Sequence, residues 1–475
     1  MSQWLPIPEL AAQVRAGQLK ASDLVEQALK TIEDTREFDA ILATTAERAR
    51  TRAASIDAAV QNGKEVGRLA GVPFVAKDNL LAFGAQSTAG SNILNGFVSP
   101  YQATVLERLE AEGAICVAKA NQDAFGHGSS TENSDYMTTK HPKDKTRVPG
   151  GSSGGSAVAV MLDMVPFALG TDTGGSIRQP ASLVGAVGYK PTYGLTSRYG
   201  VVAMASSTDT VGMLAQTVED AAVVFDVIAG RDPLDGTTIE RDAAGYADAQ
   251  LAVAGKRFGL IKEHMGEGVS SDVRQRIREA ADKFRAAGAI VKEVSLPSLE
   301  LALAVYYIIV PAEISSNLSR HDGQRYPYSH TNANNLEESY TKTRGEGFGQ
   351  EAKRRIMIGT HVLSSGYYDA YYHKAQLVRT KLINDFQAAF DRFDFLIGPV
   401  SPETAFKIGA TTEDPLKTYL LDLMTVAPSM AGIPAISVPA GTDAAGLPVG
   451  LQIMAPQRAD RALLGIAKAT QELLQ

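Results

Sequence analysis

The sequence predicts an α/β protein that folds as a single large domain, with a mixed β-sheet sandwiched between helices. Of the 475 residues, 44% are hydrophobic and 21% are charged, so the chain has enough apolar side chains for an extensive core. Helical patterns alternate along the chain with short buried-strand patterns, which is typical of α/β sheets. No stretch has the composition of an interdomain linker, and this favours one domain over several.

The first 50 residues predict helices. Leu24, Leu29 and Ile32 recur at helical spacing, so one face of this segment is apolar. Ser22 is the expected N-cap of that helix, with Glu26 nearby. We therefore expect a helical N-terminal segment ahead of the first sheet strands.

A short buried strand is predicted over residues 71–78, and it carries a lysine, Lys77, near its end. An amphipathic helix over 104–112 and a strand over 114–118 follow. Residues 157–169 are apolar except for breaks at Asp163 and Pro166, and they predict a buried helix that runs into a further strand. This alternation is expected to build the first half of the sheet.

The second half of the chain predicts another strand–helix–strand unit, over residues 257–262, 272–286 and 290–294. Residues 320–350 are polar, contain glycine and have no clear period, so we expect a long surface excursion there. A helical stretch and three strands complete the predicted fold, over residues 367–393, 395–399, 435–438 and 449–454.

Charge and cysteine content restrict the partners and the compartment. Lys and Arg total 46 against 53 for Asp and Glu, a net charge of −7, so direct binding of nucleic acid is not favoured. The single cysteine, Cys116, lies in an apolar run and is expected to be a buried thiol. No secretory signal is recognisable, and the apolar runs 157–162 and 301–310 are shorter than a membrane span. We expect a cytoplasmic protein without membrane contact.

Two Gly/Ser clusters, residues 150–156 and 171–176, are the strongest local signals. Neither has the lysine of a phosphate-binding Walker loop, and neither fits the dinucleotide pattern G-x-G-x-x-G. The first cluster formally matches the nucleophile elbow G-x-S-x-G, which requires a late histidine base. The last histidines are His361 and His373, and one elbow does not explain a second serine-bearing loop.

A lysine base would explain both clusters together with Lys77. Burial can lower the pKa of a lysine toward neutrality, and a second serine can bridge the lysine and a nucleophilic serine. Glycines let a loop turn consecutive N–H groups toward a developing oxyanion. Such an oxyanion hole is expected from the backbone N–H groups of Thr173, Gly174, Gly175 and Ser176.

Lys77, the loop 150–156 and the segment 170–180 resemble the amidase-signature hydrolases, in sequence and in spacing. The resemblance implies that Ser176 is the acyl-forming nucleophile. It further implies that Ser152, preceded by a cis peptide, is the bridging serine and that Lys77 is the base. The whole chain, 1–475, is then expected to be an amidase domain, with a helical segment over 1–60, a catalytic core over 70–200 and a substrate-pocket and surface excursion over 300–430.

The resemblance extends to segments 128–134, 189–194, 197–200, 353–357 and 365–372. These segments are similar to the glutamine-hydrolysing members of that family, which serve tRNA-dependent amidotransferases. The implied activity is hydrolysis of glutamine to glutamate, with ammonia supplied for converting Glu-tRNA(Gln) to Gln-tRNA(Gln). The analogous conversion of Asp-tRNA(Asn) to Asn-tRNA(Asn) stays open.

The same resemblance implies two partner subunits, a larger tRNA-binding kinase-transferase and a small helical one. ATP and Mg²⁺ are expected in the larger partner and no cofactor in this chain, so that tRNA is contacted only through the complex. The seven histidines form no metal motif, and no metal is expected.

A free-glutamine site needs a cation for the α-carboxylate and an anion for the α-ammonium. By resemblance, the site draws on residues from distant parts of the chain: Arg355, Asp422, Tyr306, Tyr307, Gly128 and Ser129. The register between Arg354 and Arg355 stays open.

Two alternatives are kept. A stand-alone amidase acting on other small amides would use the same three catalytic residues without partners, but it would have no need of the Arg355 and Asp422 pair. A catalytically idle scaffold of the same fold would tolerate loss of Lys77, Ser152 or Ser176, and all three are present.

Overall fold

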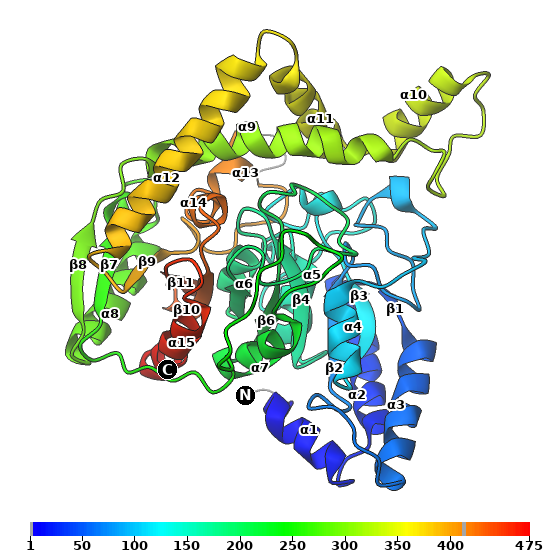
Figure 1. Ribbon diagram of the computed structural model, residues 1–475, viewed down its shortest axis with the longest axis horizontal. Coiled ribbons are helices and arrows are strands. Elements are labelled where there is room, and N and C mark those ends of the chain that lie inside the picture. The colour runs from blue at the N-terminus through cyan, green and yellow to red at the C-terminus, as the bar shows by residue number, and fades with distance from the viewer. Residues whose placement is uncertain (1–2, 411–414) are drawn as a thin grey trace.

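The computed structural model describes residues 3–410 and 415–475, and the eleven strands in these ranges form one continuous sheet (Figure 1). The strand order is β1-β3-β2-β4-β6-β5-β10-β11-β9-β7-β8. The strands are β1 (Ile41–Thr44), β2 (Pro73–Lys77), β3 (Ile115–Ala120), β4 (Phe167–Asp172), β5 (Val187–Lys190), β6 (Thr210–Ala215), β7 (Arg257–Ile261), β8 (Ile290–Val294), β9 (Phe395–Pro399), β10 (Ala435–Thr442) and β11 (Pro448–Met454).

The sheet is mixed, as predicted. Strand β2 is parallel to both β3 and β4, and at the other end β7 is parallel to both β8 and β9. Antiparallel strands β6, β5, β10 and β11 join these two parallel groups. Because β2 and β4 are parallel with Phe74 opposite Phe167, their carboxyl ends lie at the same edge of the sheet. Lys77 and Asp172, the last residues of these two strands, therefore lie at that same edge.

Helices cover both faces of the sheet. Helices α4, α7, α15 and α8 pack in succession on one face, whereas α5 and α6 pack together against β2, β4, β5 and β10. Helices α9, α11 and α12 form a separate group beside the sheet (Figure 1). The helices are α1 (Ile7–Arg15), α2 (Ala21–Asp34), α3 (Ala46–Gln61), α4 (Thr104–Ala111), α5 (Gly154–Met161), α6 (Arg178–Val184), α7 (Val218–Ile228), α8 (Ser271–Ala286), α9 (Leu299–Asn317), α10 (Leu336–Gly347), α11 (Gln350–Leu363), α12 (Lys374–Phe390), α13 (Pro415–Leu420), α14 (Val426–Met430) and α15 (Asp460–Leu474).

The central strands have no exposed face, because helices cover both of their sides. Every residue of β2, β3 and β4 is buried, so these strands show no alternation and are apolar apart from Lys77, Lys119, Thr171 and Asp172. Cys116 lies within β3 and is buried, as predicted, and burial raises the pKa of its thiol to about 12. A polar side chain in this layer therefore needs a partner within the protein.

The predicted N-terminal helices are confirmed as α1 and α2, but residues 41–44, which were expected to be helical, form the edge strand β1, and the predicted N-cap is also wrong. Helix α2 begins at Ala21, so Ser22 lies inside its first turn. The carboxylate of Asp57 on α3 accepts the N–H groups of Ala21 and Ser22, at 2.7 and 3.1 Å. A neighbouring helix thus caps α2 in place of a local serine, and such a long-range cap has no local sequence signal.

The predicted surface excursion over residues 320–350 is only partly correct. Residues 336–347 form α10, whose start is capped by Asn335 accepting the N–H of Glu338 at 2.8 Å. The helix is mostly polar and carries no apolar stripe. Apolar residues at helical spacing are the signal that predicts a helix, so this one was not predicted. Residues 368–373 form a single π-helical turn that runs directly into α12.

Helix α9 and the turn after it, Leu299–Arg320, form one segment of 22 residues that by length and composition could cross a membrane. In the fold this segment packs against α11, α12 and α14, and 50% of its apolar window is buried. The uninterrupted apolar run 301–310 is shorter than the helix because Pro311 and Glu313 follow it. Helix α9 also carries Tyr306 and Tyr307 to the candidate site.

Candidate active site

Lys77, the last residue of β2, is fully buried and donates a hydrogen bond of 2.7 Å from Nζ to the Oγ of Ser152. Its second contact is a longer one, 3.5 Å to the carbonyl oxygen of Thr171 on β4. Burial lowers the pKa of Lys77 to about 7, although the charges of Asp123 and Asp172 act in the opposite direction. A substantial fraction of this amine is neutral near pH 7 and can accept a proton.

Ser152 is held in the loop that precedes α5. The peptide bond between Gly151 and Ser152 is cis, as the family resemblance implied. Gly150 has a φ of +85°, a left-handed conformation that favours glycine. Ser152 is buried together with Lys77, so this part of the site is shielded from water.

Ser176 lies in the loop between β4 and α6 and differs from Lys77 and Ser152 because it is partly exposed. Its carbonyl oxygen accepts the N–H of Ser153 at 3.1 Å, which joins the two Gly/Ser clusters directly. Its hydroxyl has no hydrogen-bond partner among residues 3–410 and 415–475. The geometry leaves this hydroxyl available to a substrate.

The loop before Ser176 can be occupied only by residues without large side chains. A Cβ on Gly174 would lie 2.6 Å from the hydroxyl of Tyr306, and one on Gly175 would collide with Thr425. Gly175 also has a φ of +142°. Thr173 Oγ1 donates to Asp209 at 2.7 Å, which anchors the start of this loop. Burial raises the pKa of Asp209 to about 6.

A fully buried ion pair between Arg178 and Asp172 links the two ends of the loop that carries Ser176. The guanidinium of Arg178 donates two bonds to Asp172, Nε at 2.9 Å and Nη2 at 2.8 Å. It also reaches Gln452 on β11 and the carbonyl of Thr425. Burial alone would raise the pKa of Asp172, but the charge and hydrogen bonds of Arg178 hold it below its ordinary value.

Asp422 forms the anionic part of the candidate glutamine site. Its carboxylate accepts the hydroxyl of Ser129 at 2.6 Å and that of Tyr307 at 2.8 Å. Burial raises the pKa of Asp422 to about 6, while these two hydrogen bonds and the charge of Arg355 lower it. At neutral pH the carboxylate is therefore mostly ionised and can accept an ammonium group.

Arg355 is buried beside Tyr307, the tyrosine that bonds to Asp422, and its Nε donates to Glu351 at 2.8 Å. Its guanidinium lies over the rings of Tyr307 and Tyr419, at 5.3 and 5.6 Å from their centroids. Arg354 also pairs with Glu351, but its side chain is 42% exposed. The structure thus favours Arg355 for the inner position of the two arginines.

A cavity of about 120 Å³ lies next to Arg355. Gly128 lines it, and a Cβ at Gly128 would collide with the carboxyl group of Asp123. Tyr306 packs edge-on against Tyr307 and against Gly174. The full lining is Gly128, Ser130, Glu132, Asn133, Gln350, Glu351, Arg354, Arg355, Thr418 and Tyr419. The residues predicted for glutamine thus converge from α9, α11, the loop after β3 and the turn after α13.

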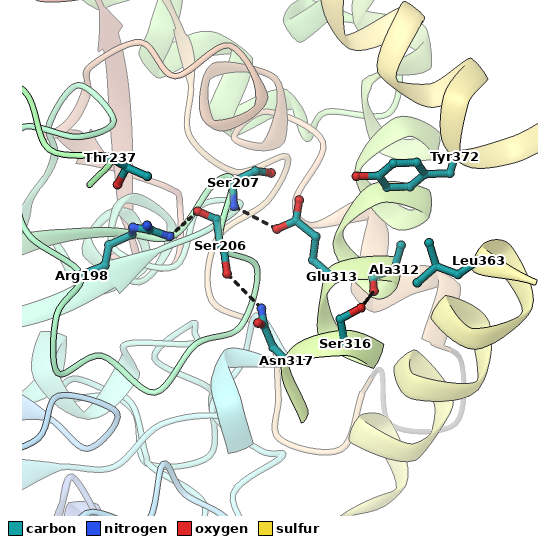
Figure 2. Close-up of a pocket in the computed structure, with 10 residues that line it drawn as sticks. All are labelled: Arg198, Ser206, Ser207, Thr237, Ala312, Glu313, Ser316, Asn317, Leu363 and Tyr372. Carbon is teal, nitrogen blue, oxygen red and sulfur yellow. Dashed lines mark hydrogen bonds between the residues drawn. The ribbon is translucent and has the colours of Figure 1, made fainter. Parts of the chain in front are cut away.

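A larger cavity, of about 470 Å³, lies along α9 and contains none of the predicted catalytic residues (Figure 2). In it Glu313 accepts the N–H of Ser207 at 2.9 Å, and Asn317 donates to Ser206 at 3.2 Å. These bonds fasten α9 to the loop that leads to Asp209. The lining residues are Arg198, Ser206, Ser207, Thr237, Ala312, Glu313, Ser316, Asn317, Leu363 and Tyr372.

The sequence did not predict four residues whose side chains hydrogen-bond to the loops of the site: Asp123, Gln179, Arg178 and Asp209. Asp123 is buried and accepts the N–H groups of Thr131 and Asn133, at 3.0 and 3.1 Å. Gln179 and Arg178 lie in the recognised segment 170–180 but had no assigned role. Their position directly after the candidate nucleophile was the available signal, whereas Asp123 and Asp209 had none.

The fold, with a buried Lys77–Ser152 bond and a partly exposed Ser176 in the neighbouring loop, is that of an amidase-type hydrolase. The chain belongs to the amidase family, whose model, described as "Amidase", matches residues 23–464. This match confirms the resemblance predicted from the sequence.

Relatives of known description extend over nearly the whole chain. The A-subunit of glutamyl-tRNA(Gln) amidotransferase from Cyanothece sp. is 50% identical over 450 residues, which are 94% of this chain and 93% of the relative. Its counterpart from Symbiobacterium thermophilum is 50% identical over 461 residues, 96% of this chain and 94% of the relative. The crystal structure of the Thermotoga maritima counterpart matches with a TM-score of 0.78 and 39% identity, covering 94% of this chain and 91% of that one.

Proposed function

We propose that this chain is the glutamine-hydrolysing subunit of a tRNA-dependent amidotransferase, and that it supplies ammonia for converting Glu-tRNA(Gln) to Gln-tRNA(Gln). The observation that carries the proposal is the 2.7 Å bond between Lys77 and Ser152 in a buried site that also holds Asp422 and Arg355. The likeness to the amidotransferase A-subunits of two bacteria, each 50% identical, supports the choice of substrate.

Substrate binding uses both charges of free glutamine. Arg355 binds the α-carboxylate, and Asp422 accepts the α-ammonium, with Ser129 and Tyr307 holding its carboxylate in place. Tyr306 and Gly128 border the same space. The side-chain amide of glutamine then lies toward Ser176.

Acylation begins when the Oγ of Ser176 attacks the amide carbon. The proton of Ser176 passes to Ser152, whose own proton passes to the neutral amine of Lys77. The oxyanion is bound by backbone N–H groups of residues 173–176. When the C–N bond breaks, protonated Lys77 returns the proton through Ser152 to the leaving nitrogen, which departs as ammonia. Water then hydrolyses the glutamyl ester on Ser176, and glutamate leaves.

The proposed complex has two further subunits, a larger one that binds tRNA and uses ATP and Mg²⁺ and a small helical one. The net charge of −7 supports leaving tRNA contact to the larger subunit. We place the complex in the cytoplasm, where tRNA is charged. Use of Asp-tRNA(Asn) as a second substrate would need no change in this chain, because its own substrate is glutamine in both cases.

Ser176→Ala in the purified complex tests the proposal. We expect glutamine-dependent amidation of Glu-tRNA(Gln) to be lost, while amidation with added ammonia is unchanged because it bypasses this chain. The ammonia reaction is the internal control for assembly. Full glutaminase activity in Ser176→Ala would overturn the catalytic assignment.

Native affinity purification of the chain from its own host tests the partner assignment. Stoichiometric recovery of a large ATP-dependent, tRNA-binding protein and a small helical one is expected. Recovery of the chain alone, with amide hydrolysis intact, would instead establish the stand-alone amidase.

A further inference from the structure

Gln179 is a fully buried amide in the first turn of α6, three residues after Ser176. Its Oε1 accepts the N–H of Gly151 at 2.9 Å, and its Nε2 donates to the carbonyl oxygen of Ser129 at 3.0 Å. Its own N–H donates to the carbonyl of Gly175 at 2.8 Å. One residue is therefore bonded to three separate loops.

Each of these loops carries a different part of the proposed reaction. Gly151 directly precedes Ser152, which accepts the hydrogen bond of Lys77. Ser129 donates its hydroxyl to Asp422, the proposed partner of the substrate ammonium. The side chain of Gln179 thus links the proton relay to the substrate-binding carboxylate.

The packing around the Gln179 amide leaves little freedom for the loop before α5 and for the loop that carries Ser129. A Cβ on Gly150 would collide with the Oε1 of Gln179, so the backbone of this loop lies directly against the amide. A second link lies beside it, because Thr131 Oγ1 donates to the carbonyl of Gly150 at 2.7 Å and accepts the N–H of Gly154 at 3.1 Å. Gln179 adds the connection to the helix that follows the nucleophile.

We propose that Gln179 is a positioning residue that sets the separation between the ammonium-binding carboxylate and the serine relay, and thereby determines selectivity for glutamine over amides without an α-amino acid group. This inference rests on the proposed function. An amide suits the position because Gly151 presents a donor and Ser129 an acceptor. Leucine would satisfy neither, and a carboxylate would face the carbonyl of Ser129 with a second acceptor.

Two probes that react with Ser176 separate positioning from general damage. A small fluorophosphonate reports activation of Ser176 alone, whereas a glutamine analogue with an electrophile at its side-chain carbonyl also requires the α-ammonium and α-carboxylate contacts. In the purified complex, Gln179→Leu should lower the rate of labelling by the analogue ~10- to 100-fold more than the rate with the small probe. Gln216→Leu is the matched control, because Gln216 also makes two side-chain hydrogen bonds but follows β6 beside the start of β4, at the opposite end of that strand from Asp172.

Gln179→Glu keeps the acceptor for Gly151, replaces the donor facing Ser129 and adds a buried carboxylate. It provides the test if the leucine variant does not fold. The same selective loss is expected. If the ratio of the two labelling rates stays at its wild-type value, whether both rates fall equally or neither falls, the role of Gln179 is overturned. Wild-type enzyme that labels no faster with the analogue than with the same analogue lacking its amino group would instead overturn the proposed function.

Discussion

At the scale of single residues, Lys77 shows how burial changes the chemistry of an amine. An exposed lysine with a pKa near 10.5 is almost entirely protonated at pH 7 and cannot act as a base. Full burial at the end of β2 lowers the pKa of Lys77 to about 7, even though Asp123, Asp172 and Asp209 favour its charged form. These carboxylates keep the lysine titratable near neutrality.

We expect kcat/KM for glutamine to rise with pH through about 7, because only neutral Lys77 can accept the proton from Ser152. Lys77→Met should lower kcat ~10²- to 10⁴-fold and remove the limb near pH 7, leaving the limb near pH 6 that ionisation of Asp422 contributes. A pH profile of glutaminase activity checks both statements. An acidic limb centred near pH 10 would show that Lys77 keeps its ordinary pKa in the folded protein.

Asp422 gives a second prediction at this scale. Asp422→Asn removes the negative charge that accepts the substrate ammonium while keeping the size of the side chain. We expect a large increase in KM for glutamine, with a smaller effect on labelling of Ser176 by a small fluorophosphonate. Parallel loss of both would place Asp422 in the support of the serine relay and not in substrate binding.

At the scale of elements, the loop between β4 and α6 depends on contacts from helices far away in sequence. Gly174 lies against Tyr306 of α9, and Gly175 lies against Thr425 at the start of α14. Helix α9 is in turn fastened through Glu313 and Ser207. The loop between β4 and α6 therefore keeps its shape only while these helices stay in place.

Gly174→Ala should lower kcat for glutamine hydrolysis about 10²-fold, because a methyl group 2.6 Å from the Tyr306 hydroxyl must displace the loop or the tyrosine. Gly236→Ala is the control, since no atom lies within 4 Å of the added Cβ. Steady-state kinetics and a thermal melt of both variants check the effect. Equal kinetics in the two variants would show that the loop tolerates the methyl group.

At the scale of the whole molecule, the site lies at the carboxyl ends of β2 and β4, next to the antiparallel strands that join the two parallel parts of the sheet. Arg178 on α6 bonds to Asp172 at the end of β4 and to Gln452 in β11, which belong to different parts of the sheet. All of these groups are buried, so the guanidinium has no access to water as a substitute partner. The ion pair therefore contributes to the active site and to the assembly of the sheet.

Arg178→Leu should lower the free energy of unfolding by about 3 to 5 kcal/mol, because it leaves the buried charge of Asp172 without its cation. Urea denaturation at neutral pH measures this loss. Because the pair holds the pKa of Asp172 below its ordinary value, its stabilisation is complete above the unfolded pKa and is lost as pH falls through the lower folded value. The double variant Asp172→Asn/Arg178→Leu should recover part of the loss, and a larger loss than in the single variant would contradict this account.

Much of the fold could be predicted because the buried strands are continuous apolar runs. The strands near residues 73, 115, 167, 257 and 395 were all found this way. Helix α10 was missed because it has no apolar stripe, and the cap of α2 because Asp57 lies on another helix. The candidate catalytic residues were identifiable from local motifs, whereas Asp123 and Asp209 act through contacts distant in sequence, which spacing alone does not predict.

The complete burial of Lys77 also has a consequence for its reactivity toward added reagents. Acylating reagents attack the neutral amine, and at pH 7 about half of Lys77 is neutral, so it is intrinsically more reactive than the charged lysines on the surface. A reagent cannot reach it while β2 is covered on both faces. The rate of acylation of Lys77, measured by mass spectrometry, therefore reports how often the structure around the end of β2 opens locally.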